Sequence, residues 1–154
     1  MPADLASGDP ADWLKQHDLA RVLFYQAEVH LDDGDIRSAR ERTREALDIL
    51  ERVSSAHPGE RDLLRLIGMA RMMESRIAAA EGHPEETAPW SRAWDILQPL
   101  AAGSNDHRML DPAARALILG GRADDARDLV EKLRTMGYAR EDLLLLCRNH
   151  GLVQ

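Results

Sequence analysis

Helical spacing of apolar residues, interrupted by glycine, is the feature that most constrains the fold of this chain. Apolar residues recur three or four positions apart through most of the 154 residues, and apolar/polar alternation never continues for the length of a strand. Ala, Leu, Arg and Glu dominate, and aromatic residues are only 4% of the chain. This composition favours helix over strand. The sequence therefore predicts an all-α protein.

Glycine and proline divide the helical pattern into seven expected helices. Asp9-Pro10 predicts the first start, because an N-cap followed by proline suits the first helical turn. Trp13, Leu19, Val22, Leu23, Ala27 and Val29 carry its apolar spacing. The expected helices span residues 10–33, 36–56, 60–81, 84–99, 106–119, 123–136 and 140–149. Asp111-Pro112 leaves two alternatives for the fifth helix, one unbroken and one split with Asp111 as a second N-cap.

The expected helices group into pairs. Gly34, Gly82 and Gly121 each mark the tight turn of one pair. The last helix has no partner helix and is expected to form a cap. We therefore expect three antiparallel helix pairs with a C-terminal capping helix. Residues 1–8 are small and polar and are expected to form a flexible N-terminal tail, and residues 9–154 a single helical domain.

The first pair resembles a tetratricopeptide repeat (TPR), a helix–turn–helix unit with small and large residues at fixed offsets. Leu23-x3-Ala27-x2-His30 precedes Gly34-Asp35-Ile36, and Ala39-x3-Thr43-x2-Ala46 follows. Small side chains at Ala27, Ala39 and Ala46 would let two helices approach closely. His30 and Thr43 depart from the family, which prefers aromatic residues there. The resemblance implies a TPR-like helical-repeat stack.

The C-terminal part carries a second resemblance, through Leu110-Asp111-Pro112, Gly121-Arg122 and Met136-Gly137-Tyr138. It is similar to the last repeat and cap of TPR tails in bacterial multidomain signalling proteins such as serine/threonine kinases. The chain itself lacks the Gly-rich nucleotide loop, His-Arg-Asp and Asp-Phe-Gly motifs of a kinase. This resemblance implies one alternative function, a regulatory or sensor TPR region of a larger signalling protein.

Charge and cysteine content narrow the class of protein. Twenty basic residues face 27 acidic ones, giving a net charge of −7, which argues against nucleic-acid binding because that requires clustered excess positive charge. No segment approaches the ~20 apolar residues of a membrane helix, and the N-terminus lacks a secretion signal. Cys147 is the single cysteine, so no intrachain disulfide can form. We expect a cytoplasmic protein without membrane attachment.

No motif in the sequence requires catalysis. The six histidines are scattered and none forms a metal-binding pair, and no nucleophile lies in a recognisable catalytic motif. We therefore predict a protein that is not an enzyme, with no catalytic residues, no metal and no cofactor. A small helical enzyme or metal-binding protein remains as an alternative.

The resemblance to TPR proteins implies that the first helix of each pair lines a concave groove that binds a peptide or partner helix. The expected groove residues are Arg21, Tyr25, Glu28, Met69, Met73, Arg76, Arg108 and Arg115. Met72 is an adjacent candidate, but Met72 and Met73 cannot both face the groove squarely, so at least one of them is expected in the core. Methionine suits adaptable apolar contacts and arginine can grip a carboxylate through paired hydrogen bonds. The predicted function is a non-catalytic protein–protein interaction module, a scaffold or adaptor. A homodimer covering an apolar patch around Trp90 is a further alternative.

Overall fold

A computed structural model describes residues 10–83 and 88–153. All regular secondary structure in these residues is helical, which confirms the predicted all-α class. The helices are α1 (Pro10–Asp32), α2 (Ile36–Ala56), α3 (Arg61–Ala80), α4 (Ala88–Ala101), α5 (His107–Leu119), the 3₁₀ turn η2 (Ala123–Ala126), α6 (Arg127–Thr135) and α7 (Glu141–Asn149). The expected tail at 1–8, the Asp9 cap and the start of the fourth helix at Pro84 lie outside the described residues.

The predicted helix boundaries are confirmed for α1, α2, α3 and α7 to within one or two residues. One detail of the prediction is wrong. The sixth helix begins as the separate 3₁₀ turn η2, and only residues 127–135 are α-helical. Of the two alternatives for the fifth helix, the unbroken one is confirmed, because α5 continues through Pro112 and Asp111 is not a cap. The N-cap of α5 is Asp106, whose side chain accepts from the backbone N–H of Arg108.

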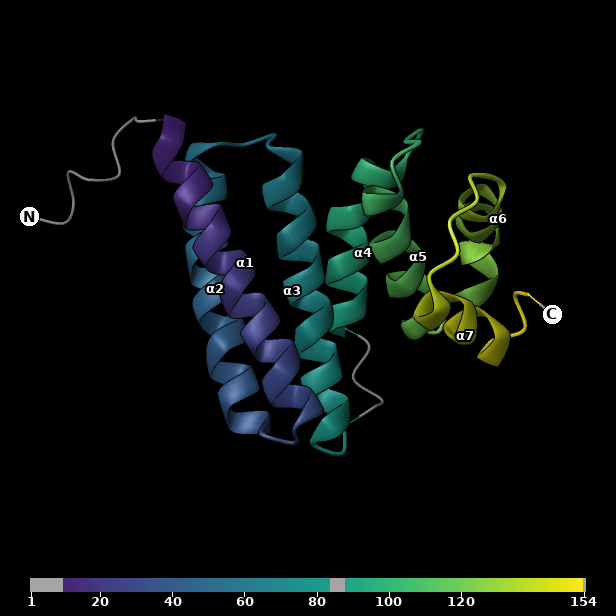
Figure 1. The fold of residues 1–154 in the computed structure, drawn as a ribbon, viewed down its shortest axis with the longest axis horizontal. Helices are drawn as coiled ribbons and strands as arrows, with labels where there is room; N and C mark the ends of the chain where they lie inside the picture. The colour runs from purple at the N-terminus through teal and green to yellow at the C-terminus, as the bar shows by residue number, and fades with distance from the viewer. Residues whose placement is uncertain (1–9, 84–87, 154) are drawn as a thin grey trace, which may run out of the picture.

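Tight glycine turns join α1 to α2 and α3 to the segment that follows. Gly34 has φ +81° and Gly82 has φ +94°, backbone conformations that are costly for residues with a Cβ. Asp35 then caps α2, because its carboxylate accepts a hydrogen bond of 3.1 Å from the backbone N–H of Ser38. This chemistry reverses the chain within three residues, so α1 and α2 lie side by side and antiparallel (Figure 1).

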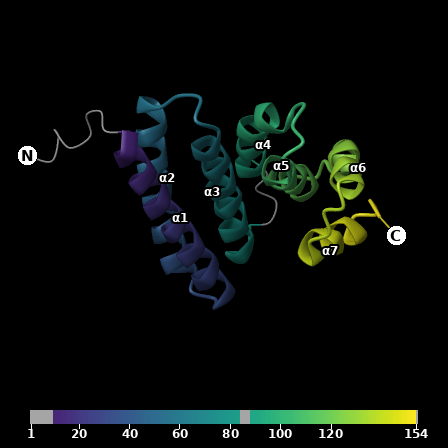
Figure 2. The same ribbon diagram turned by 45° about the horizontal axis from the view of Figure 1, so that its top comes forward.

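The helices follow one another along the molecule, as Figures 1 and 2 show. Each helix from α1 to α5 packs against the next one in the chain. In addition, α1 contacts α3, and α3 contacts α5, which in turn contacts α7. These four alternate helices therefore lie next to one another on one side of the molecule.

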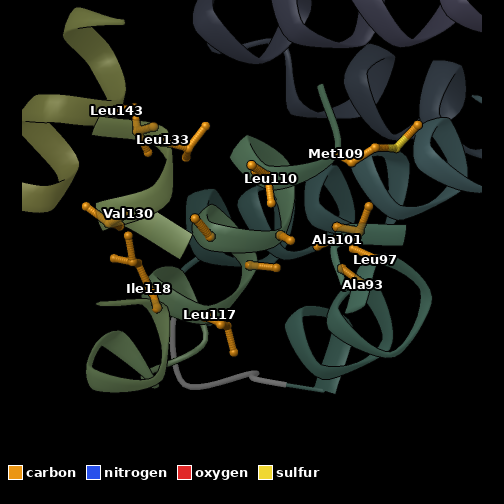
Figure 3. Close-up of a cluster of buried hydrophobic side chains, with 14 of the residues drawn as sticks. Ala93, Leu97, Ala101, Met109, Leu110, Leu117, Ile118, Val130, Leu133 and Leu143 are labelled. Atoms are coloured by element: carbon orange, nitrogen blue, oxygen red, sulfur yellow. The ribbon is translucent and has the colours of Figure 1, made fainter. Parts of the chain in front are cut away.

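Two apolar clusters form the core, and α3 contributes to both. The first cluster joins α1, α2 and α3 and includes Leu50, Leu63 and Met73. The second joins residues from α4 to α7 (Figure 3) and also includes Met72 of α3. Because Met72 and Met73 belong to different clusters, α3 connects the two halves of the molecule.

Helix α3 packs tightly against α4 at Gly68. An added Cβ at this position would lie 2.6 Å from the Cγ of Leu97, a residue with no exposed surface. Glycine therefore fits this contact, and a larger residue would force Leu97 to shift.

The two tryptophans of α4 serve packing. Trp90 is buried in the second cluster and Trp94 packs against that cluster, with the Arg122 guanidinium 5.8 Å from its ring centroid. The alternative of an exposed apolar patch around Trp90 is therefore wrong, because that side chain is only 7% exposed. Within the described ranges, no helix is both long enough and apolar enough to cross a membrane.

Candidate functional site

A concave cavity of about 630 Å³ opens along the side of the molecule where α1, α3, α5 and α7 meet. It brings together seven of the eight residues predicted from the sequence: Tyr25, Glu28, Met69, Met73, Arg76, Arg108 and Arg115. Arg21 does not line the cavity; it is exposed and its guanidinium lies 3.1 Å from Asp18. Met72 lines the cavity together with Met73. We call this the α1–α7 groove.

Helical spacing places the lining residues on common faces. Tyr25 and Glu28 are one turn apart on α1, and Met69, Met73 and Arg76 follow one another at three- and four-residue intervals on α3. Residues at these intervals lie above one another on a helix. The turn at Gly34 between α1 and α2, the turn at Gly59 between α2 and α3, and the packing of α1 on α3 then bring these faces to one side.

An ion pair joins the α1 and α3 walls of the groove. The Arg76 Nη1 lies 3.2 Å from the Glu28 Oε1, and its Nη2 lies 3.7 Å from an oxygen of Asp32. Both Arg76 and Glu28 are half-buried. Two of the predicted binding residues therefore hold each other, and Arg76 helps to fix the distance between the two helices.

Arg65 is a groove residue that the sequence analysis missed. Its side chain is only 20% exposed, and its Nε has no hydrogen-bond partner. One terminal nitrogen lies 3.4 Å from the sulfur of Met69, and Asp62 lies 3.6 Å from the Nε, within ion-pair range. Arg65 lies one turn before Met69 on the same face of α3, so helical spacing alone was a sufficient signal for it. Its guanidinium retains unused donor capacity beside the apolar floor.

The carboxyl end of the groove is built around Asp111, a buried carboxylate on α5. It accepts hydrogen bonds from the Nε of Arg115 and from the Tyr138 hydroxyl. Burial, followed by this bond to Asp111, raises the pKa of Tyr138 to about 12. The Tyr138 ring also stacks on His107, with ring centroids 5.0 Å apart. This network ties the segment before α7 to α5.

Arg115 extends the network to α7. Its Nη2 lies 3.0 Å from the Oδ2 of Asp142, which also accepts from Arg140. Burial acts to raise the pKa of Asp142, but the two guanidinium groups outweigh it and hold that pKa below the usual value. Arg115 therefore supports the groove wall while presenting a charged group at its rim.

Charged side chains of both signs line and flank the groove. Its lining arginines are Arg65, Arg76, Arg108, Arg115 and Arg140, and its lining carboxylates are Glu28, Asp111 and Asp142. Three carboxylates beside the lining also pair with these arginines, namely Asp62 with Arg65, Asp32 with Arg76 and Asp106 with Arg108. A bound segment would therefore meet guanidinium groups that are already held in place by carboxylates of the chain.

The described residues contain no group of three or more His, Cys, Asp or Glu side chains placed to hold a metal ion. The thiol of Cys147 is buried, and burial raises its pKa, which lowers the fraction of reactive thiolate. This side chain packs in the cluster that holds α7. The groove therefore offers recognition groups, namely guanidinium donors and apolar side chains.

A second, smaller cavity of about 380 Å³ lies between α2 and α3. Its charged groups already pair with one another across the two helices, Arg40 with Glu81 and Arg71 with Glu51. These ion pairs connect α2 to α3 and leave fewer groups for a ligand than the α1–α7 groove.

No family model, curated protein or solved structure matches this chain. Its function is therefore inferred from the residues and the geometry of the groove.

Proposed function

We propose that this chain is a TPR-like stack of helix pairs and a non-catalytic protein–protein interaction module, a scaffold or adaptor of the cytoplasm, whose α1–α7 groove receives a peptide or a partner helix. The observation that carries this proposal is the gathering of seven separately predicted residues, from three helices, around one cavity. The contacts of α1 with α3 and of α3 with α5 support the repeat arrangement, because stacked helix pairs place their first helices side by side.

Recognition in the groove combines an apolar floor with charged walls. Met69, Met72 and Phe24 supply polarisable and aromatic surface that can adapt to different apolar side chains. A cavity of about 630 Å³ is large enough for a few anchoring side chains but not for a whole helix, so a bound helix would insert one face only.

Arg65 is the group best placed to fix the orientation of the bound segment. Its side chain is 20% exposed and one of its terminal nitrogens lies 3.4 Å from the Met69 sulfur, so a carboxylate one turn from an apolar anchor would lie near both. The partner segment is therefore expected to carry an acidic residue near an apolar one. A regulatory TPR region of a larger signalling protein, the alternative implied by the C-terminal resemblance, would use the same groove.

Selection of binders from a random peptide display library, followed by fluorescence anisotropy with the purified peptides, tests the proposal. We expect enriched peptides to combine acidic and large apolar residues. Met69→Glu and Arg65→Gln should each weaken binding by about tenfold or more, because each removes a contact worth ~1.4 kcal/mol or more.

Arg37→Gln is the matched control for Arg65→Gln. Arg37 is exposed on α2 outside the groove and pairs with Glu41 at 3.1 Å, and its replacement should leave the affinity unchanged. Peptides that bind the Met69→Glu variant as well as the original chain would show that the α1–α7 groove is not the binding site.

A further inference from the structure

Helix α1 has a second apolar face that no described part of the chain covers. Its core face, with Ala20, Leu23 and Ala27, is buried against α2 and α3. The opposite face carries five large apolar side chains that are each 47 to 59% exposed: Leu14, Leu19, Val22, Tyr25 and Val29. We call these five residues the α1 stripe.

The α1 stripe lies at an end of the molecule, where a polar surface is the usual arrangement. Helix stacks need a polar outer face on their terminal units to remain soluble. The neighbouring helix α2 meets this requirement, because its exposed positions include Arg37, Glu41 and Arg44. Figure 2 shows α1 and α2 together at this end. The exposed ion pair of Asp18 with Arg21 interrupts the α1 stripe one turn before Val22. Exposed apolar side chains gathered at such a position are nevertheless typical of an interaction surface.

The stripe is nearly symmetric about Val22. Leu19 and Tyr25 lie three residues before and after it, whereas Leu14 lies eight residues before it and Val29 seven residues after it, so the outer two positions match only to within one residue. Two antiparallel copies of α1 that cross at Val22 would therefore place Leu19 of one copy opposite Tyr25 of the other, on both sides of the axis. A two-fold interface requires this kind of self-complementary surface.

Charge at the two ends of the stripe favours the antiparallel direction. Lys15 and Asp33 are exposed, and neither forms an ion pair with a described residue. Helical side chains lean toward the N-terminus. In the antiparallel arrangement, Lys15 therefore leans toward the C-terminal end of the other α1, where Asp33 lies. A parallel pair would instead bring the two Lys15 side chains together.

From the exposed stripe, its symmetry and these charges, we propose that α1 is a homodimerisation surface, on which a second copy of this chain packs antiparallel across Val22. The 16 residues from Leu14 to Val29 span about 22 Å of helix, and a face about 10 Å wide gives roughly 200 Å² per copy. This is far below the ~800 Å² per partner of a stable interface. The dimer is therefore expected to be weak, with a dissociation constant on the order of hundreds of micromolar and rapid exchange.

Sedimentation velocity over a concentration series from about 1 µM to about 1 mM tests this proposal. We expect the mass to rise from the 17.2 kDa of the monomer toward twice that value. Val22→Glu places two carboxylates at the axis and should raise the dissociation constant by on the order of 100-fold. Leu145→Glu is the matched control, because Leu145 is 55% exposed on α7, and it should leave the dissociation constant unchanged.

Charge reversal tests the antiparallel register. Lys15→Glu should weaken the dimer by about fivefold, and the double variant Lys15→Glu/Asp33→Lys should recover the original constant. A chain that stays monomeric at every concentration overturns the proposal, as does a dimer that survives Val22→Glu. A dimer whose dissociation constant is the same in both charge variants as in the original chain overturns the antiparallel arrangement. Circular dichroism of each variant shows that it remains folded, as is expected for substitutions at exposed positions.

Discussion

Replacement of Gly68 by alanine tests the packing of α3 on α4, the contact that joins the two halves of the core. A Cβ at Gly68 would lie 2.6, 2.7 and 3.1 Å from the three outer carbons of Leu97. Carbon atoms in good contact are about 3.5–4.0 Å apart. Leu97 is fully buried in the second apolar cluster (Figure 3), so it can move away only by displacing other core side chains.

Two opposing effects set the magnitude. Alanine in place of a helical glycine stabilises the helix by ~1 kcal/mol, whereas overpacking a core costs about 1–3 kcal/mol. Gly68→Ala should therefore lower the free energy of unfolding by up to about 2 kcal/mol. Leu97→Ala removes the clash, at its own cost of about 2–5 kcal/mol. In that background, Gly68→Ala should instead raise the free energy of unfolding by up to about 1 kcal/mol.

A double-mutant cycle measures this reversal of sign. The free energy of unfolding of the original chain, both single variants and the double variant is obtained from urea titrations followed by far-ultraviolet circular dichroism. The two backgrounds should differ by about 1–3 kcal/mol in their response to Gly68→Ala. The same stabilising response in both backgrounds would refute the steric argument, because it would show that α3 and α4 accommodate a Cβ at this position.

Three further predictions concern the turn after α1 and the Asp111 network. Gly34→Ala should lower the free energy of unfolding in urea by about 1 kcal/mol, since its φ of +81° is unfavourable for alanine; an unchanged value would contradict this. Asp111→Ala should cost about 2–3 kcal/mol in the same assay by leaving Arg115 and the Tyr138 hydroxyl without their acceptor, whereas Asp124→Ala, which breaks an exposed pair, should cost less than ~1 kcal/mol. Because the pKa of Tyr138 rises from 10.0 to about 12 on folding, the folded chain keeps a proton that the unfolded chain loses. Stability should therefore decline as the pH rises from 10 to 12, and Tyr138→Phe should remove this part of the decline; identical pH profiles for the two chains would contradict it.

The helix boundaries could be predicted because local chemistry sets them. Gly34 and Gly121 have φ of +81° and +82°, and glycine is the residue that adopts such values at little cost. Asp111-Pro112 was harder to interpret, because an aspartate before a proline is also typical of a helix start. Its side chain instead accepts bonds from Arg115 and from Tyr138, 27 residues further along the chain. The second of these contacts depends on tertiary structure and leaves no local signal.

Only part of the groove could be predicted, because some of its residues are set by helical spacing and others by tertiary packing. Residues that share a helical face, such as Met69 and Arg76, follow from spacing once the first helix of each pair is assumed to face inward. Arg140 and Asp142 also line the groove, but their position depends on the packing of α7 against α5. The residue pattern of α7 does not indicate how that helix packs against α5, so these residues could be found only from the structure.

Helix α1 shows where apolar periodicity is ambiguous. Leu23 and Ala27, four residues apart, are in the core. Val22 and Val29, seven residues apart, also fit a helical repeat but are exposed on the opposite side. A helix that is apolar on both faces is usually buried on both faces. In the described chain, α2 and α3 cover only one of them. The pattern in the sequence is therefore the pattern of a helix with neighbours on two sides, and a second copy of α1 would supply the missing one.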